Sequence, residues 1–450
     1  MTDIPALTQE QPGDDPDDVL FSQLYGLRTI ELNRPKKLNS LNGSMARKII
    51  GRLKEYSKSD LANIIVIKGA GRAFCAGGDV AALAQWNKNC EAHKSNDYFA
   101  LEYKLDHLIA SYQKPYIAYM DGITMGGGVG LSVHAPFRIA TENTVFAMPE
   151  TTIGFYPEVG ASFFLPRMDG QMGIYLALTS EQLKGVDVFY HGIATHYLHS
   201  TSLDALSQRL AELQFKDYTP LQDRHKLIAS TIAEFTTGLP NPRPTIHGAL
   251  RKAIDMCFSH HTALEILAAL QDLSESPSTS SDLKIWADKT IATIRERSPT
   301  GVAVSLREMQ KGRGWSIARA FQNEYDISSH FMNHPDFVTG VYARLIERKK
   351  GRPEWKPSSL EEVKEEDVER FFTTPTPEAG GRLRLLESGE QADFRDYPHA
   401  WIGLPSEEEV LRVKEKGLMK EEVVQHFLRE KDAKVGVREK VEEVLERLDE

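Results

Sequence analysis

The chain has 450 residues, of which 41% are hydrophobic, 26% charged and 9% aromatic, and its formal net charge is −10. That apolar fraction is too high for a disordered chain and is enough to build a sizeable core. No run of about 18 apolar residues occurs, so the sequence predicts no membrane span. Three cysteines exclude a disulfide scaffold, and no CxxC or HExxH pair points to a metal site.

The negative charge is concentrated at the C-terminal end of the chain. Residues 361–450 hold 25 acidic and 15 basic residues, which equals the whole net charge and leaves residues 1–360 neutral. A neutral body with an acidic tail argues against extensive binding to DNA or RNA.

Residues 1–18 are acidic and contain three prolines, so we expect a disordered leader. They lack the Arg-rich amphipathic pattern of a mitochondrial transit peptide and the apolar core of a secretory signal. The chain is therefore expected either to stay in the cytosol or to lack its targeting segment.

The next elements alternate between strands and helices. A β-hairpin with its turn at Tyr25-Gly26 is expected first. The following elements are expected to be a helix over 43–57, a strand over 63–71, a helix around 96–112, a strand over 116–122 and two short strands within 137–150. This alternation predicts an α/β domain with parallel strand pairing over residues 19–200.

From about residue 170 the pattern becomes mostly helical. Apolar residues recur at spacings of three and four in the segments 202–215, 222–236, 247–256, 261–271, 282–296 and 303–311. We expect a helical region over 201–372. Residues 373–450 are expected to form a linker, rich in Pro, Thr and Gly over 373–382, and a charged helical extension over 406–417, 419–431 and 436–449.

The first candidate functional motif is the small-residue loop GRAFCAGGD (71–79), directly after a predicted strand. Small residues let backbone N–H groups approach a ligand oxygen. A tight turn leaving the strand explains the loop equally well. It is neither a dinucleotide nor a Walker loop, since GxGxxG and GxxxxGK[ST] are absent.

The second motif is GITMGGGVGL (122–131), which also follows a strand and opens a helix. Three successive glycines at a helix N-terminus collect free N–H donors and partial positive charge, which suits a developing oxyanion. Close packing of helix on strand is the alternative explanation.

The third motif is FAMPETTIGFYPEVG (146–160), in which Glu150 and Glu158 flank an apolar turn. Partial desolvation raises the pKa of a carboxylate toward that of a useful general base. A helix cap or salt bridge for Glu150, and an exposed loop acid for Glu158, are the structural alternatives.

Together and in this order, the three motifs resemble the crotonase (enoyl-CoA hydratase/isomerase) superfamily, and within it the 3-hydroxyisobutyryl-CoA hydrolase branch. The resemblance extends over about 19–357 and includes ELNRPKKLNSLN (31–42) and DFVTGVYARLIERKKGRPEWKP (336–357). It implies a spiral of ββα units followed by a helical region. It also implies hydrolysis of the thioester of 3-hydroxyisobutyryl-CoA, a step of valine catabolism, in the mitochondrial matrix.

The resemblance also implies roles for particular residues. The backbone N–H groups of Ala76 and Gly127 would form the oxyanion hole for the thioester carbonyl. Glu150 would activate water or attack to give a mixed anhydride, and Glu158 would bind the 3-hydroxyl or assist proton transfer. The implied substrate contacts are Glu102, Gly77, Gly78, Asp79 and Gly126. Coenzyme A belongs to the substrate, so no separate cofactor and no metal are expected.

Two positions depart from related patterns. Enoyl-CoA hydratases place a second glutamate four positions after the first glycine of the GGG run, where this chain has Gly130, which argues against hydration. The hydrolase branch usually has aspartate where this chain has Glu158. Its carboxylate extends one methylene further, and a misplacement of about 1 Å costs roughly 100-fold in rate.

The extension supports a competing function. Certain fungal relatives of the hydrolase are small-subunit components of the mitochondrial ribosome, and this chain resembles them in its long tail. Contact with ribosomal proteins through the extension is therefore an alternative to, or an addition to, catalysis. An apolar stripe available for docking is expected from Val410, Leu411, Leu418, Val423, Val424, Phe427 and Leu428, with a solvated helical appendage as the simpler interpretation. The sequence leaves the oligomeric state open.

Overall fold

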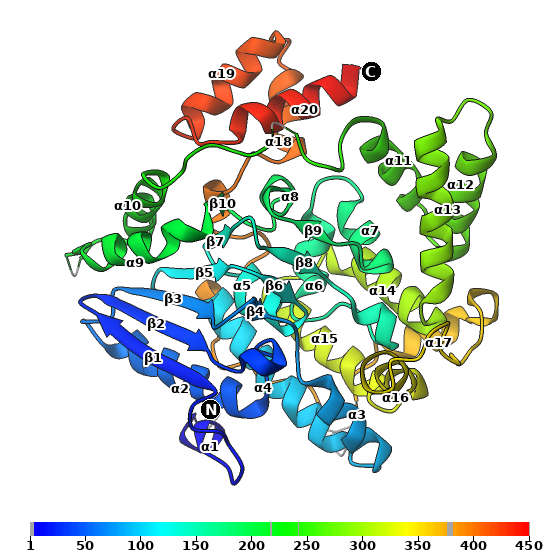
Figure 1. The fold of residues 1–450 in the computed structure, drawn as a ribbon, viewed down its shortest axis with the longest axis horizontal. Coiled ribbons are helices and arrows are strands. Elements are labelled where there is room, and N and C mark those ends of the chain that lie inside the picture. The colour runs from blue at the N-terminus through cyan, green and yellow to red at the C-terminus, as the bar shows by residue number, and fades with distance from the viewer. Residues whose placement is uncertain (1–3, 217, 242, 376–380, 450) are drawn as a thin grey trace.

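The computed structural model of the chain describes residues 4–216, 218–241, 243–375 and 381–449. An α/β body, a helical region and a C-terminal helical unit pack together (Figure 1). Within the described ranges, no helix is long and apolar enough to cross a membrane.

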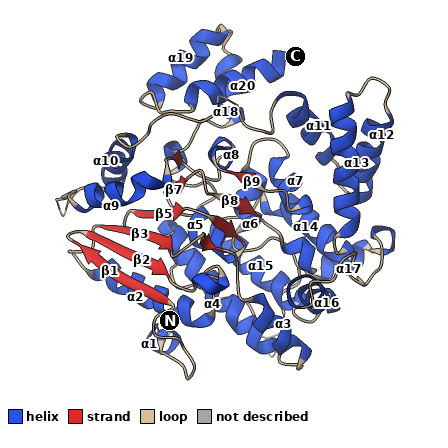
Figure 2. Ribbon diagram, viewed as in Figure 1, coloured by secondary structure: helices blue, strands red, loops and turns tan. Residues whose placement is uncertain are grey.

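Six strands form the main sheet, in the order β1-β2-β3-β5-β7-β10. β1 and β2 pair antiparallel as the predicted hairpin, and each later neighbour pairs in parallel. The strands are β1 (Val19–Leu24), β2 (Leu27–Leu32), β3 (Ile64–Gly69), β5 (Tyr116–Met120), β7 (Phe137–Ala140) and β10 (His196–Tyr197). Figure 2 shows helices surrounding these strands.

A second sheet of four short strands carries the loops of interest, in the order β4-β6-β8-β9. Its strands are β4 (Ala73–Cys75), β6 (Ile123–Met125), β8 (Val145–Ala147) and β9 (Leu183–Lys184). The pairs β3/β4, β5/β6 and β7/β8 each give one strand to each sheet. The two strands predicted within 137–150 are thus confirmed, but they lie in different sheets.

The helices of the body follow these strand pairs, as the predicted spiral of ββα units requires. They are α2 (Gly43–Lys58), α3 (Val80–Lys88), α4 (Ala92–Ala110), α5 (Gly127–Val133), α6 (Ala161–Phe164), α7 (Met172–Thr179) and α8 (Val186–Tyr190). The helical region consists of α9 (Leu203–Ala211), α10 (Leu221–Ala233), α11 (Gly248–Phe258), α12 (Ala263–Glu275), α13 (Ser281–Glu296), α14 (Pro299–Gly312), α15 (Ile317–Phe331), α16 (Pro335–Val341) and α17 (Glu365–Arg370).

The main sheet is covered on both faces. In β3, Ile65 and Ile67 enter the large core that includes α2 and α4, whereas Ile64 and Val66 enter a second core with α9 and α10. Strands buried on both sides read as continuous apolar runs instead of alternating patterns, which explains the run at 63–71.

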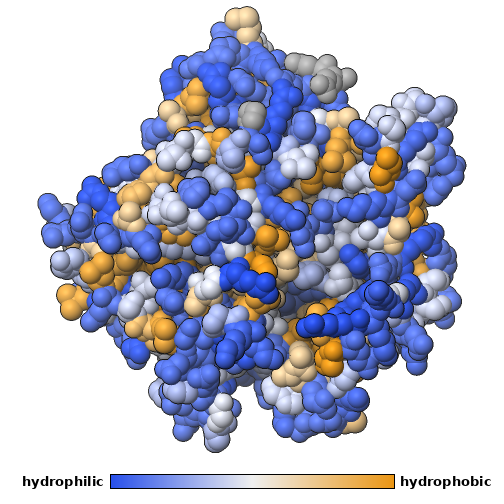
Figure 3. All heavy atoms as spheres, viewed as in Figure 1, coloured by the Kyte–Doolittle hydropathy of each residue, from blue (hydrophilic) through white to orange (hydrophobic). Residues whose placement is uncertain are grey.

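The extension folds into a compact helical unit of α18 (Glu407–Lys414), α19 (Lys420–Glu430) and α20 (Val437–Asp449). Its own core buries Val410, Val423, Val424 and Phe427 against α20. Most of the predicted docking stripe is therefore internal, because the three helices bury it against one another. The surface of this unit in Figure 3 is mainly hydrophilic.

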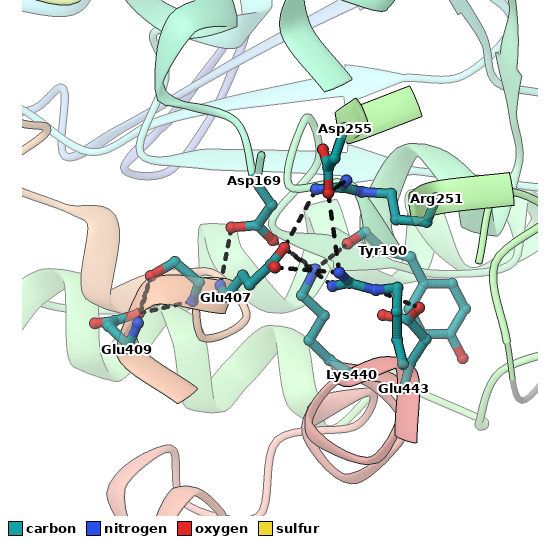
Figure 4. Close-up of polar contacts among 10 residues, drawn as sticks. Asp169, Tyr190, Arg251, Asp255, Glu407, Glu409, Lys440 and Glu443 are labelled. Atoms are coloured by element: carbon teal, nitrogen blue, oxygen red, sulfur yellow. Dashed lines mark hydrogen bonds and ion pairs between the residues drawn. The ribbon is translucent and has the colours of Figure 1, made fainter. Parts of the chain in front are cut away.

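Ion pairs join the extension to the body (Figure 4). Lys440 pairs with Asp169 at 2.6 Å, and the N–H of Glu407 donates to the same carboxylate at 2.9 Å. Arg251 of α11 and Arg447 of α20 both contact the Glu407 carboxylate, at 3.2 and 3.0 Å. Each buried charge in this interface thus has a partner of opposite sign.

The N-terminal segment differs from the disordered leader that the sequence predicts. α1 (Ile4–Thr8) packs against α2, Asp14 pairs with Arg47, and Asp18 pairs with Lys48 at 2.7 Å. The acidic residues are held by basic residues of α2, a tertiary contact that composition does not reveal. Residues 1–3, and residues 376–380 of the predicted linker, lie outside the described residues.

Candidate active site

Two glycine turns meet at the carboxyl ends of β4 and β6. These strands pair in parallel, so the loops that leave them lie side by side. A Cβ atom added to Gly126 would lie 3.3 Å from the Cα of Gly77, and one added to Gly127 would lie 3.3 Å from the backbone N of Gly78. The two backbones approach too closely for side chains between them, which explains the glycines in both motifs.

Backbone N–H groups at this junction are free to bind an oxygen. Gly127 is the first residue of α5, where an N–H has no intrahelical acceptor. Within the described ranges, the N–H groups of Gly78 and Gly127 have no hydrogen-bond acceptor. The N–H of Ala76 donates instead to the carbonyl oxygen of Leu38 at 3.0 Å. The assignment of Ala76 to the oxyanion hole is therefore wrong, and the geometry offers Gly78 beside Gly127.

Two of the predicted acids flank the glycine turn. A Cβ atom on Gly127 would lie 2.5 Å from Oε1 of Glu102, and one on Gly126 would lie 3.1 Å from Oε1 of Glu150. Glu102 comes from α4, whereas Glu150 begins a short 3-10 turn after β8. The structure thus brings together residues from three motifs that are distant in sequence.

Burial dominates the electrostatics of these acids. Desolvation raises the pKa of Glu102 to about 8, although the hydroxyl of Tyr98 donates to its carboxylate at 3.2 Å and opposes the rise. Desolvation also raises the pKa of Glu150 to about 8, its own backbone N–H opposes this, and the charge of Glu102 adds to it. Oε2 of Glu150 has no partner within the described part of the chain. Such a carboxylate is a strong base once ionised.

Glu158 lies in a strained turn beside the same acids. Burial, followed by the charges of Glu102 and Glu150, raises its pKa well above the ordinary value. The next residue, Val159, has φ +57°, a left-handed conformation that is rare for a β-branched residue and costs roughly 1–3 kcal/mol. The Nε2 atom of His134 contacts the carbonyl oxygen of Val159 at 2.7 Å, which fixes this turn.

Two further acids, Asp106 and Glu324, lie beside the site and escape the sequence prediction. Asp106 follows Glu102 by four residues on α4, a spacing that places both on one helix face and would have revealed it. Glu324 of α15 accepts hydrogen bonds from the N–H groups of Gly160 and Ser162, at 2.7 and 2.9 Å. These bonds hold the turn that contains Glu158. Glu324 is so far from this turn in the sequence that no local motif connects the two.

The presence of glycine at position 130 also has a steric explanation. A Cβ atom there would lie 2.5 Å from Oδ2 of Asp106 and 2.8 Å from the Cβ of Val159. A glutamate at this position, as expected of a hydratase, has no room. The structure therefore agrees with the sequence argument against hydration.

Asp79 behaves differently from the other predicted contacts. Its carboxylate pairs with Arg34 at 3.0 Å, and Arg34 also donates to the carbonyl oxygen of Ser40 at 2.6 Å. The side chain of Asp79 therefore helps to fix the shape of the glycine loop.

Cys75, in the same motif, is fully buried, and burial raises the pKa of its thiol to about 12, which does not suit a nucleophile.

No group of three His, Cys, Asp or Glu side chains within the described ranges has the arrangement of a metal site. The chemistry that the site offers comes from free N–H donors and desolvated carboxylates, an arrangement suited to an acyl group whose carbonyl oxygen becomes negative.

The pattern of the enoyl-CoA hydratase/isomerase family matches residues 27–372. The chain belongs to this family, the crotonase superfamily of α/β enzymes. A solved carnitinyl-CoA dehydratase from Mycobacterium thermoresistibile superposes with a TM-score of 0.70 at 31% identity, covering 83% of this chain and 100% of that one. The predicted fold class is confirmed.

Relatives of two kinds share the family fold. The small ribosomal subunit protein mS47 of Neurospora crassa is 51% identical over 97% of this chain and 86% of its own length. The mitochondrial 3-hydroxyisobutyryl-CoA hydrolase of Danio rerio is 40% identical over 79% of this chain and 90% of its own length. These relatives place the chain in the mitochondrion, in agreement with the location that the resemblance implies.

Proposed function

We propose that this chain hydrolyses the thioester of 3-hydroxyisobutyryl-CoA or a closely similar short branched 3-hydroxyacyl-CoA. The observation that carries the proposal is the buried carboxylate of Glu150, whose Oε2 has no partner within the described ranges, beside a glycine turn with free N–H groups. The relatives that carry the name of this hydrolase support the choice of substrate.

Each part of the site has a role in this reaction. The N–H groups of Gly78 and Gly127 donate to the thioester carbonyl oxygen and stabilise the negative charge that develops on it. Glu150 either takes a proton from the attacking water or attacks the carbonyl carbon, giving an anhydride that water then cleaves. Either route consumes one water and releases the free acid and the thiol of coenzyme A. Glu158 binds the 3-hydroxyl or relays a proton.

The test is release of thiol from 3-hydroxyisobutyryl-CoA by the purified chain, beside the variant Glu150→Gln. Turnover that the substitution removes supports the proposal. A folded, inactive wild-type protein would contradict it, and the longer side chain of Glu158 would then be the first position to change, to aspartate. Incubation in ¹⁸O-labelled water under single-turnover conditions separates the routes, since only the anhydride route can leave ¹⁸O in the Glu150 carboxylate.

A second candidate function, association with the ribosome, is supported by the coverage of the relatives. The small ribosomal subunit protein mS47 of Neurospora crassa is matched over 97% of this chain, which includes most of the extension, whereas the hydrolases match 79% of the chain or less. We propose that the extension joins the protein to the small subunit of the mitochondrial ribosome through its hydrophilic outer surface. Because the extension contains none of the residues assigned to thioester hydrolysis, the two functions are compatible.

Co-sedimentation of the protein with mitochondrial small subunits in a sucrose gradient tests this second function. The variant Glu150→Gln should sediment with the subunit as the wild type does, since the substitution leaves the extension unchanged. Absence of the wild-type protein from the small-subunit fraction at low salt would contradict the ribosomal proposal and leave the hydrolase proposal intact.

A further inference from the structure

A cavity of about 430 Å³ lies between the body and the C-terminal unit, away from the glycine turns. β10 and α10 form one side of it, and the segment Trp401–Ile402 and the turn after α19 form the other. Its volume is in the range of small-ligand pockets. Because body and extension each supply part of the wall, the cavity exists only when the extension is docked.

The walls of the cavity are largely apolar. Apolar side chains that line it are Phe189, Ala229, Ala233, Leu239, Trp401 and Ile402. Burying an aliphatic chain against such walls stabilises a complex by about 0.8 kcal/mol per methylene, or roughly fourfold in affinity.

The ammonium of Lys434 in this cavity has no ion-pair partner among the residues that the structure describes. Lys434, in the turn after α19, lines the cavity, and its side-chain amine makes no ion pair or hydrogen bond within the described ranges, although its backbone N–H donates to the carbonyl oxygen of Lys431 at 3.0 Å. Lys431 is engaged by the carbonyl oxygen of Trp401 at 3.1 Å, and Lys226 at the rim pairs with Asp223 at 3.3 Å. Oε2 of Glu430, also in the wall, lies 3.3 Å from Nε2 of His426.

The surroundings of Lys434 favour the binding of an anionic ligand. Burial, then the charges of Lys431 and Arg138, lowers the pKa of the Lys434 amine to about 7. The charged and titratable groups facing it are Lys431, Arg138 and His196, with Glu430, Asp432 and Lys226 also lining the cavity. A desolvated cation without a partner is costly, and a bound anion removes that cost.

We propose that this cavity is a binding site for a small monocarboxylate with an aliphatic chain, its carboxylate on Lys434 and its chain against Trp401 and Ala229. The apolar walls select the chain, and the unpaired ammonium selects the carboxylate. The site uses none of the residues assigned to thioester hydrolysis, so it stands or falls independently of that reaction.

Isothermal titration calorimetry with octanoate, using the full chain, tests the proposal. Octanoate should bind with one-to-one stoichiometry, and 1-octanol, which has the same chain without the charge, should bind at least tenfold more weakly. Lys434→Met should weaken octanoate binding at least tenfold. The matched control Lys226→Met removes a lysine that is already paired at the rim and should change the affinity less than twofold.

Three results would overturn the proposal: no saturable binding of octanoate, equal binding of octanol, or an affinity that Lys434→Met leaves unchanged. Ala229→Phe fills the cavity from α10 and gives a second variant, which should abolish octanoate binding while a short carboxylate such as acetate is unaffected. Glu150→Gln should bind octanoate as the wild type does, which separates this site from the proposed active site. At pH 8, binding should take up protons, because the carboxylate raises the pKa of Lys434.

Discussion

Buried carboxylates occur in two regions of this molecule, and their surroundings are opposite. At the glycine turns, Glu102, Glu150 and Glu158 lie close together, none of them pairs with a basic residue in the part of the chain that the structure describes, and the pKa of each is raised. At the interface between body and extension, Asp169 is partly buried. There, the charge and hydrogen bond of Lys440 outweigh desolvation and hold the pKa of Asp169 below its ordinary value.

This difference in charge pairing distinguishes the proposed active site from the interface that docks the extension. A carboxylate with a matched cation is satisfied and has little reason to react. Carboxylates collected without cations destabilise the fold and persist only where something else requires them. On this criterion we propose that Glu102, Glu150 and Glu158 are functional, whereas the paired acids of the interface are structural.

One chain of contacts connects the two regions. The hydroxyl of Tyr397, in the segment leading to the extension, contacts Nδ1 of His134 at 2.7 Å, and Nε2 of His134 contacts the carbonyl oxygen of Val159 at 2.7 Å. Val159 follows Glu158 directly. Docking of the C-terminal segment therefore has a direct path to the position of a catalytic candidate.

The largest effect is expected from Glu150→Gln. It should lower kcat for thiol release by roughly 10²–10⁴-fold, because the amide neither accepts a proton from water nor attacks a carbonyl carbon. The comparison variant is Glu308→Gln, the same change at another fully buried acid, which has no hydrogen-bond partner within the described ranges and is close enough to Glu150 to be affected by its charge. Equal losses in both variants would show that burial alone does not mark the catalytic acid, and the comparison above would fail.

Lys440→Met tests the structural side of the comparison. It leaves the partly buried carboxylate of Asp169 without the ammonium of Lys440, so the extension should be released more easily, by about 1–3 kcal/mol. Hydrogen exchange of the amides in α18, α19 and α20 measures this free energy. Arg412→Met, which removes an exposed pair with Glu408, should change it by no more than about 0.5 kcal/mol.

Tyr397→Phe tests the connection between the two regions. Loss of its contact with His134 should lower kcat about threefold to tenfold, equivalent to about 1 kcal/mol, with little change in KM. Tyr190→Phe is the control, because its hydroxyl donates to the carbonyl oxygen of Asn241 at 2.7 Å and has no path to Val159. An unchanged kcat in Tyr397→Phe would mean that the regions act separately.

The smallest effect is the dependence of stability on pH. The pKa values of Glu102 and Glu150 are raised to about 8, so the folded protein binds more protons than the unfolded chain between about pH 4.5 and 8. Stability from these groups is present below that window and falls as pH rises through it. At pH 8, Glu150→Gln should raise the Tm by roughly 1–3 °C relative to wild type, an advantage that disappears at pH 5. Scanning calorimetry at the two values measures it, and the same difference at both would contradict the raised pKa.

Local patterns were sufficient for much of this protein. The hairpin at β1 and β2, the helices from α9 to α14 and those of the extension follow from apolar spacing and turn residues, which act over a few positions. The order of the motifs was enough to indicate the family and to select Glu150 and Gly127. Asp106 could have been added, since its spacing of four from Glu102 is itself a local signal.

Only the tertiary structure decided which groups are free. The N–H of Ala76 is lost to Leu38, Asp79 is engaged by Arg34, and the stripe of the extension is buried in its own core, because each meets a partner distant in sequence. The pairing of Asp14 with Arg47 is decided in the same way. Sequence determines which residues are able to react or dock, through their chemistry and local spacing. Long-range packing determines which of them remain unpaired to do so, because burial and partners depend on the whole fold.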